Sequence, residues 1–187
     1  MLKAYKALSI IISPPAMALY VILAFSLFSP IGIGSLSTAT SIAIGMVFLV
    51  IIPILSAYFL RKKIIDIERS ERTIPYLISI AGYTIASALF WYMGSKIMFL
   101  ISVSYFSVVS AILVINMFWK ISAHAAGTAG PTTALIYVFG IGLTPLYVLT
   151  LLIMWARFKL NVHSALQVIT GSVVAIFITS LVYTILW

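Results

Sequence analysis

The sequence predicts an all-α, polytopic membrane helix bundle of about six to seven transmembrane helices, folded as a single integral membrane domain over residues 1–187. Two observations predict this class. Of the 187 residues, 64% are hydrophobic and only 7% are charged, whereas charged residues make up about a quarter of a typical soluble domain. The apolar residues also fall into long runs separated by short polar stretches. Such a chain is expected to have lipid as its outer solvent.

Seven apolar runs divide the chain, and each is expected to be a helix. Lipid offers the backbone no hydrogen-bond partners, so a spanning segment satisfies its own amides by forming a helix. The longer runs approach or exceed the roughly 20 residues that cross about 30 Å of hydrocarbon; they are residues 7–28, 41–60, 75–93, 97–118 and 163–187. The two shorter runs, residues 125–139 and 143–156, are expected to form a tight helical hairpin packed inside the bundle.

The first run is expected to be a retained helix. Lys3 and Lys6 precede it, as basic residues precede the apolar part of a signal peptide. However, the run is too long for that part, it contains Pro14-Pro15, and further apolar runs follow it. These features favour a transmembrane segment over a cleaved signal.

Basic residues are concentrated at one end of the predicted helices. If each run crosses once, every basic residue except Lys96 lies on one face, together with both histidines. The positive-inside rule then predicts that this face is cytoplasmic. Because these residues lie in short loops, the net charge of +8 indicates membrane orientation or a bound anion rather than a nucleic-acid partner. The chain has no cysteine, which excludes disulfides, thiolate metal sites and cysteine nucleophiles.

The two histidines are the first candidates for chemistry. His124 lies in "FWKISAHAAGTAG" and His163 lies in "WARFKLNVHSALQ", each beside a cation and at an expected helix end. A single polar residue at a membrane interface commonly only caps a helix. Two histidines at the same depth, each near an arginine or lysine, instead favour a shared site.

Two short motifs resemble those of the type 2 phosphatidic acid phosphatase superfamily, membrane phosphatases related in fold to the vanadium haloperoxidases. The third motif of that superfamily is S-R-x5-H-x3-D, and this chain has Arg157, five residues and then His163. The second motif is P-S-G-H, and this chain has Ser122 and His124 in "ISAH". The resemblance covers a motif-bearing region of about residues 61–187 and implies a lipid-phosphatase-like core.

Several positions depart from the superfamily pattern. Ala156 replaces the serine of the third motif and Gln167 replaces its aspartate. The first motif, K-x6-R-P, is matched only by Arg72 and the nearby Pro75, and no lysine stands seven residues before Arg72. The candidates for the missing cation are Lys62, Lys63 and Lys120.

The resemblance implies an enzyme that hydrolyses a lipid phosphate or diphosphate through a phosphohistidine intermediate, without a metal or other cofactor. In this chemistry His163 attacks phosphorus and His124 protonates the departing lipid alkoxide. Fixed cationic and N–H donors hold the phosphate. The implied phosphate ligands are Arg157, Arg72, Ser122, Lys120 and the backbone N–H near Ala123. The implied partners are the lipid phosphate substrate and the surrounding membrane lipids.

Gln167 determines how much activity to expect. It follows His163 by four residues, so it lies on the same helical face and its amide oxygen can accept a hydrogen bond from the ring. It cannot supply the negative charge of the aspartate that the superfamily has there. Losing such a charge in the serine-protease triad lowers turnover by about ten-thousand-fold, largely through the wrong tautomer, and a glutamine oxygen facing the ring would keep the tautomer. We therefore expect weakened or retuned activity rather than none.

Two alternatives stay open at this level. The first is a catalytically inactive protein that binds lipid head groups, or a small transporter, on the same fold. A transporter would more naturally carry ionisable residues in mid-span, and the clear spans have none. The second is a magnesium–diphosphate site like that of membrane prenyltransferases, near Asp66, Glu68 and Glu71. That class needs two Asp-rich motifs, and this chain has one aspartate.

Overall fold

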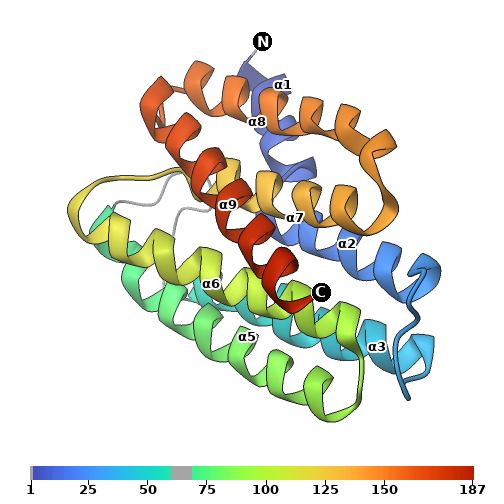
Figure 1. The fold of residues 1–187 in the computed structure, drawn as a ribbon. Coiled ribbons are helices and arrows are strands. Elements are labelled where there is room, and N and C mark those ends of the chain that lie inside the picture. Colours follow the sequence, from blue (N-terminus) through green and yellow to red (C-terminus); the bar gives the residue numbers. More distant parts are fainter. Residues whose placement is uncertain (1, 60–68) are drawn as a thin grey trace.

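The computed structural model describes residues 2–59 and 69–187, and over these ranges it contains helices and loops but no strand (Figure 1). The prediction of an all-α fold is confirmed for this part of the chain. In chain order the elements are α1 (Leu2–Ile11), α2 (Pro14–Phe28), α3 (Thr38–Gly45), the π-helix η1 (Met46–Ile51), α4 (Ile52–Phe59), the 3₁₀-helix η2 (Arg69–Arg72), α5 (Thr73–Tyr92), α6 (Lys96–Phe118), α7 (Ala123–Phe139), the 3₁₀-helix η3 (Ile141–Leu146), α8 (Tyr147–Lys159) and α9 (Ala165–Leu186).

Five helical segments are long and apolar enough to cross a membrane, and the bent pair α1–α2 makes up to six. The five are Thr38–Tyr58, Arg69–Tyr92, Lys96–Phe118, Ile141–Lys159 and Ala165–Leu186. The sequence predicted six to seven spans. The difference lies in α7, whose 17 residues fall short of the roughly 20 that a helix needs to cross the hydrocarbon core.

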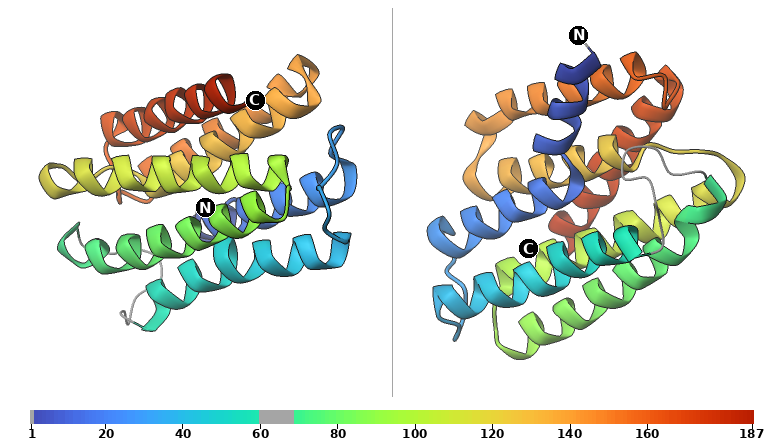
Figure 2. Two further views of the ribbon diagram at one scale, coloured as in Figure 1. Left: turned by 60° about the horizontal axis from the view of Figure 1, so that its bottom comes forward. Right: turned by 180° about the vertical axis from the view of Figure 1, so that it is seen from behind.

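Helix α7 lies in the middle of the bundle, in contact with α9, α2, α8 and α6 (Figures 1 and 2). Small residues allow this close packing. A Cβ atom at Gly127 would lie 2.5 Å from the Cβ of Pro14 in α2, and one at Gly171 in α9 would lie 2.6 Å from the carbonyl oxygen of Ser122. The predicted hairpin of α7 and α8 is present, but only α7 is packed inside, since α8 buries a single face.

The first apolar run is broken, where the sequence predicted one helix. Helices α1 and α2 bend by 40° at the residues between them. Pro14 and Pro15 begin α2, since proline is tolerated in the first turn but not further inside a helix. The Ser13 side chain accepts a hydrogen bond from the Ala16 N–H at 3.4 Å. The Thr128 hydroxyl of α7 lies 2.9 Å from the His124 carbonyl and 3.3 Å from the Ile12 carbonyl, so its one hydrogen is shared between them. The break turns α1 across the end of the bundle, against α8.

The start of α5 is tied to the end of α6. Asn116 Nδ2 donates to the Arg69 carbonyl at 3.0 Å, and Arg69 Nη1 donates to the Met117 carbonyl at 2.8 Å. Asn116 is therefore a hydrogen-bonding group between two helical segments. At the other end of α6, Lys96 donates to the carbonyl of Trp187. The α5–α6 pair therefore returns the chain to the level of Arg72 just before α7 begins.

Candidate functional site

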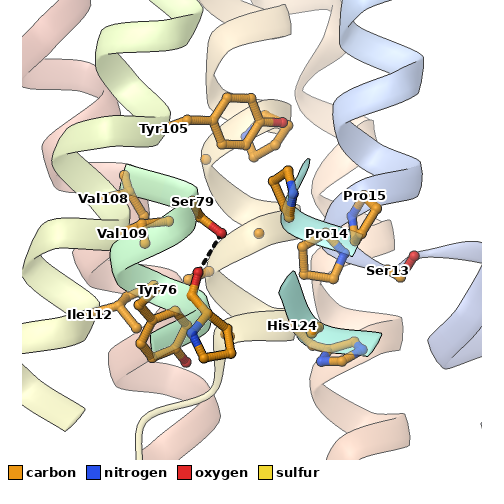
Figure 3. Close-up of a pocket in the computed structure, with 18 of the residues that line it drawn as sticks. Ser13, Pro14, Pro15, Tyr76, Ser79, Tyr105, Val108, Val109, Ile112 and His124 are labelled. Atoms are coloured by element: carbon orange, nitrogen blue, oxygen red, sulfur yellow. Dashed lines mark hydrogen bonds between the residues drawn. The ribbon is translucent and has the colours of Figure 1, made fainter. Parts of the chain in front are cut away.

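One cavity of about 400 Å³ lies among the helices, and its wall includes five of the sequence-predicted site residues. These five are Arg72, Ala123, His124, Arg157 and His163. They come from the starts of α5 and α7, the end of α8 and the turn after it. Figure 3 shows His124 and Tyr76 at one end of the cavity and Tyr105 at the other. Folding thus brings together charged and titratable side chains that are widely separated in the sequence.

The turn between α8 and α9 directs His163 inward. Helix α8 ends at Lys159, and Asn161 adopts a left-handed backbone conformation with φ of 55°, which asparagine tolerates better than most residues. The Val162 N–H donates to the Arg157 carbonyl at 3.3 Å and closes the turn. As a result His163 is only 6% exposed.

Gln167 fixes the orientation of the His163 ring. Its Oε1 lies 3.1 Å from His163 Nδ1 and accepts the Ser164 backbone N–H at 3.0 Å. The second contact identifies this atom as the oxygen, because a backbone N–H can only donate. A neutral His163 therefore carries its proton on Nδ1 and leaves the lone pair of Nε2 available. Gln167 also completes a capping box with Ser164 at the start of α9, so one residue both orients the histidine and stabilises the helix.

Two guanidinium groups are buried at the histidine end of the cavity. Arg157 is 2% exposed and Arg72 is 7% exposed. Arg72 Nη1 donates to the Ile121 carbonyl at 3.0 Å, which joins α5 to the segment that leads into α7. Removing charged groups from water costs several kcal/mol per ion. An anion bound in the cavity would offset that cost.

The start of α7 presents backbone N–H groups to the same space. Ser122 is the N-cap, and its Oγ accepts the Ala125 N–H at 3.3 Å. The cavity is lined by Ala123 but by neither Ser122 nor Lys120. The Ser122 side chain therefore caps α7 and does not line the cavity. The first backbone N–H groups of the helix have no intrahelical partner, so these groups are the donors that an anion would meet. Lys120 is half-buried, and its charge is close enough to act on His163.

Helix α1 contributes residues that the sequence did not identify as part of the site. Lys6, Ser9 and Ile10 line the cavity, and the Ser9 backbone forms a hydrogen bond with His124. Lys6 was interpreted only as a determinant of orientation. The available signal was the Pro14-Pro15 pair, which predicts a break in the helix but not the direction in which α1 then runs.

No family model, curated protein or solved structure matches this chain. The likeness to the phosphatase superfamily therefore stays a resemblance carried by the residues named above. The function has to be inferred from the site itself.

The electrostatic environment keeps both histidines neutral in the substrate-free protein. Burial, together with the charges of Arg72 and Arg157, lowers the pKa of His163 from its usual 6.5 to about 4. The Gln167 hydrogen bond acts in the opposite direction. Burial, Arg157 and His163 lower the pKa of His124 to about 3. A neutral imidazole is the form that can attack phosphorus.

Titration of His163 in the substrate-free protein is expected to have its midpoint near pH 4. Protonation brings a third positive charge beside Arg72 and Arg157, so the ring stays neutral as the pH falls from 8 to about 5 and gains its proton only below that. The measurement follows the ring ¹³C resonances of histidine-labelled protein as a function of pH. The chain has two histidines, so two signals have to be resolved. The His124→Gln variant assigns the two signals. A midpoint near 6.5 for His163 would contradict this electrostatic account.

The acidic residues of the magnesium alternative contribute little to the described site. Asp66 and Glu68 lie outside the described residues, as do Lys62 and Lys63, two candidates for the missing cation. Glu71 is in η2 with its side chain exposed. Within residues 2–59 and 69–187, no three histidine, aspartate or glutamate side chains are grouped so as to hold a metal ion.

Proposed function

We propose that this protein is an integral membrane phosphatase that hydrolyses a lipid phosphate or diphosphate, with His163 as the nucleophile. The observation that carries the proposal is the convergence of two histidines and two buried arginines on one end of a largely apolar cavity. Buried guanidinium groups suit a phosphate. An apolar wall reached from the membrane suits the hydrocarbon part of a lipid. Together these features favour a substrate that has both a phosphate group and a hydrocarbon chain.

The phosphate binds at the histidine end of the cavity. Arg72 and Arg157 offer forked N–H groups that match phosphate oxygens and neutralise their charge. The N–H groups at and after Ala123 add donors at the positive end of the α7 dipole. Lys6, on the cavity wall, and Lys120, beside it, add positive charge around the phosphate.

Hydrolysis proceeds in two displacements at phosphorus. In the first, Nε2 of His163 forms a bond to the terminal phosphorus, the bond from that phosphorus to the leaving oxygen breaks, and His124 gives its proton to that oxygen. The leaving group is the lipid alkoxide of a monophosphate or the lipid monophosphate of a diphosphate. In the second, water attacks phosphorus, His124 takes a proton from that water, and the bond from nitrogen to phosphorus breaks. Phosphate leaves, and both histidines return to their starting states.

His124 must carry a proton when the alkoxide leaves, although its pKa in the substrate-free protein is about 3. A phosphate dianion bound between Arg72 and Arg157 brings two negative charges close to the ring. These charges favour the imidazolium and raise the pKa of His124. The proton is therefore taken up together with the substrate.

The direct test is phosphate release by the purified, detergent-solubilised protein from a panel of lipid monophosphates and diphosphates, with and without a metal chelator. We expect release that survives chelation, because both displacements use only histidine and arginine groups. Release that requires added Mg²⁺ would favour the magnesium alternative. If the panel binds but no phosphate is released, the chain is a head-group-binding protein that keeps the site without turnover.

Replacing Gln167 by glutamate is expected to raise kcat roughly two- to ten-fold. Glutamate has the same length, so it keeps the acceptor for His163 Nδ1 and the Ser164 N–H, and its charge stabilises the cationic ring that forms on attack. A charge-assisted hydrogen bond is about twice as strong as a neutral one, so the charge adds roughly 0.5–1.5 kcal/mol of stabilisation in the transition state.

The matched control is Gln167→Met, which keeps the length of the side chain but removes the acceptor. We expect this variant to lower kcat, because His163 then loses both its orientation and its tautomer. The measurement is kcat at saturating lipid phosphate, with the melting temperature checked for each variant. A glutamate variant no faster than the native protein, and equally stable, would show that charge at residue 167 does not limit turnover.

A further inference from the structure

Beyond the histidine end, the cavity continues between the helices and its wall becomes apolar. The residues that line this section include Leu49, Ile101, Val108, Val109 and Ile112. Figure 3 shows the two valines and Ile112 on one side and Pro14 and Pro15 on the other, between the levels of His124 and Tyr105. A phosphate group gains nothing from contact with an apolar wall, whereas a hydrocarbon chain would bury its apolar surface against it.

The inner end of the apolar section is marked by a change to polar groups. Tyr83 and Tyr105 both line it, with ring centroids 5.4 Å apart. The hydroxyls of Ser104, Tyr105 and Thr179, also on the wall, have no hydrogen-bond partner among the residues that the structure describes. At about 1.5 Å per helical residue, Tyr105 lies roughly 10 Å along α6 from Ile112. The apolar section is therefore long enough for a stretch of extended chain.

The cavity also reaches the outer surface of the bundle. Four of the residues on its wall are exposed. Besides Lys6 of α1 they are the large apolar or aromatic residues Ile10 of α1 (63%) and, on α4, Ile54 (44%) and Tyr58 (59%). Exposed apolar and aromatic side chains such as Ile10, Ile54 and Tyr58 suit contact with lipid. The gap between α1 and α4 is thus a lateral opening, with Lys6 also on the cavity wall.

The size of the cavity limits what it can hold. At roughly 30 Å³ for a group the size of a water molecule, 400 Å³ holds about thirteen such groups. That is enough for a phosphate and a stretch of one chain. It is too small for a phosphate, a glycerol backbone and two chains side by side.

We propose that this cavity takes up one hydrocarbon chain of a lipid phosphate, which enters sideways from the bilayer between α1 and α4. The protein therefore prefers single-chain lipid phosphates to diacyl ones. This inference rests on the proposed function only in that the phosphate binds at the histidine end. The chain site itself is defined by the apolar wall, the lateral opening and the volume.

The test narrows the apolar section by replacing Val109 with tryptophan. Val109 is half-buried, so a larger side chain there can project into the cavity. The probes are dodecyl phosphate, butyl phosphate and dioleoyl phosphatidate, with binding followed by native mass spectrometry and turnover by phosphate release. The matched control is Val114→Trp, because Val114 is on the same helix, is 56% exposed and is not among the residues that line the cavity.

We expect Val109→Trp to lower the affinity and kcat/KM for dodecyl phosphate at least ten-fold, because each excluded methylene is worth up to roughly four-fold in affinity. Butyl phosphate should change by less than two-fold, and Val114→Trp should change neither. In the native protein, dodecyl phosphate should be preferred to the phosphatidate. If Val109→Trp does not fold, Val108→Phe narrows the same section with a smaller change.

The two proposals fail in different ways. If no probe is hydrolysed but Val109→Trp still weakens dodecyl phosphate binding selectively, the phosphatase proposal fails and the chain site stands. If phosphate is released but the phosphatidate is used as well as dodecyl phosphate, or if Val109→Trp affects butyl and dodecyl phosphate alike, the chain site is wrong and the phosphatase proposal stands.

Discussion

Replacing His163 by alanine is expected to lower phosphate release at least roughly a thousand-fold. The buried ring has its Nδ1 bonded to Gln167, which leaves Nε2 as the attacking atom. Without the ring no bond from nitrogen to phosphorus can form, and water alone has to displace the alkoxide. The measurements are the initial rate of phosphate release and the amount of acid-labile, base-stable phosphate label trapped on the protein during turnover.

The His124→Ala variant separates the two histidine roles in the same experiment. With an aryl phosphate, whose leaving group needs no proton, this variant should still form the phosphohistidine but hydrolyse it slowly, so that label accumulates. His163→Ala should trap none. If label appeared in His163→Ala and was lost in His124→Ala, the two roles would have to be exchanged.

Replacing Arg157 by alanine is expected to lower kcat/KM roughly a hundred- to a thousand-fold, the usual effect of removing one donor that stabilises charge in the transition state. The side chain is 2% exposed and lines the cavity beside both histidines, so little solvent screens it from a bound phosphate. Arg157→Lys should recover only part of the loss, because lysine keeps the charge but not the forked pair of donors.

A matched control for Arg157 lies two residues further along α8. Lys159 is exposed, and its Nζ lies 4.5 Å from the centroid of the Trp155 ring, outside the cavity. Lys159→Ala should therefore leave kcat/KM within about two-fold. Orthovanadate should raise the melting temperature of the native protein and of Lys159→Ala by mass action, but not that of Arg157→Ala. Equal losses of kcat/KM in Arg157→Ala and Lys159→Ala would indicate a general electrostatic effect and contradict a phosphate-binding role for Arg157.

The parts of this protein that depend on local sequence were predictable. The apolar runs indicated helices because a backbone in lipid must satisfy its own hydrogen bonds. The sequence predicted a contact between His163 and Gln167 because residues four apart share a helical face. The contact is present at 3.1 Å, but His163 precedes the N-cap Ser164, so the Gln167 side chain reaches back over the start of α9 to make it.

The assembly of the candidate site depended on tertiary structure. Arg72 and His124 are separated by the whole α5–α6 pair, and only the packing of that pair places the Arg72 guanidinium 3.0 Å from the Ile121 carbonyl, just before α7. Similarly, the sequence predicted one helix over the first apolar run, whereas the structure breaks it before Pro14, and the direction of α1 follows from its contacts with α8 and His124. Neither relationship has a local signature in the sequence.

The sequence by itself determined that this chain is helical, that several of its helices are long and apolar enough to cross a membrane, and that two histidines with basic neighbours lie at its helix ends. Tertiary structure alone decided that Lys6 lines the site, that Ser122 caps a helix instead of lining the cavity, and that a cavity leads from the histidines to the outer surface. The physical reason is the distance along the chain over which each of these effects acts. Hydropathy and helical periodicity act over a few turns, whereas a cavity is the space left where several helices, distant in sequence, fail to fill the volume between them.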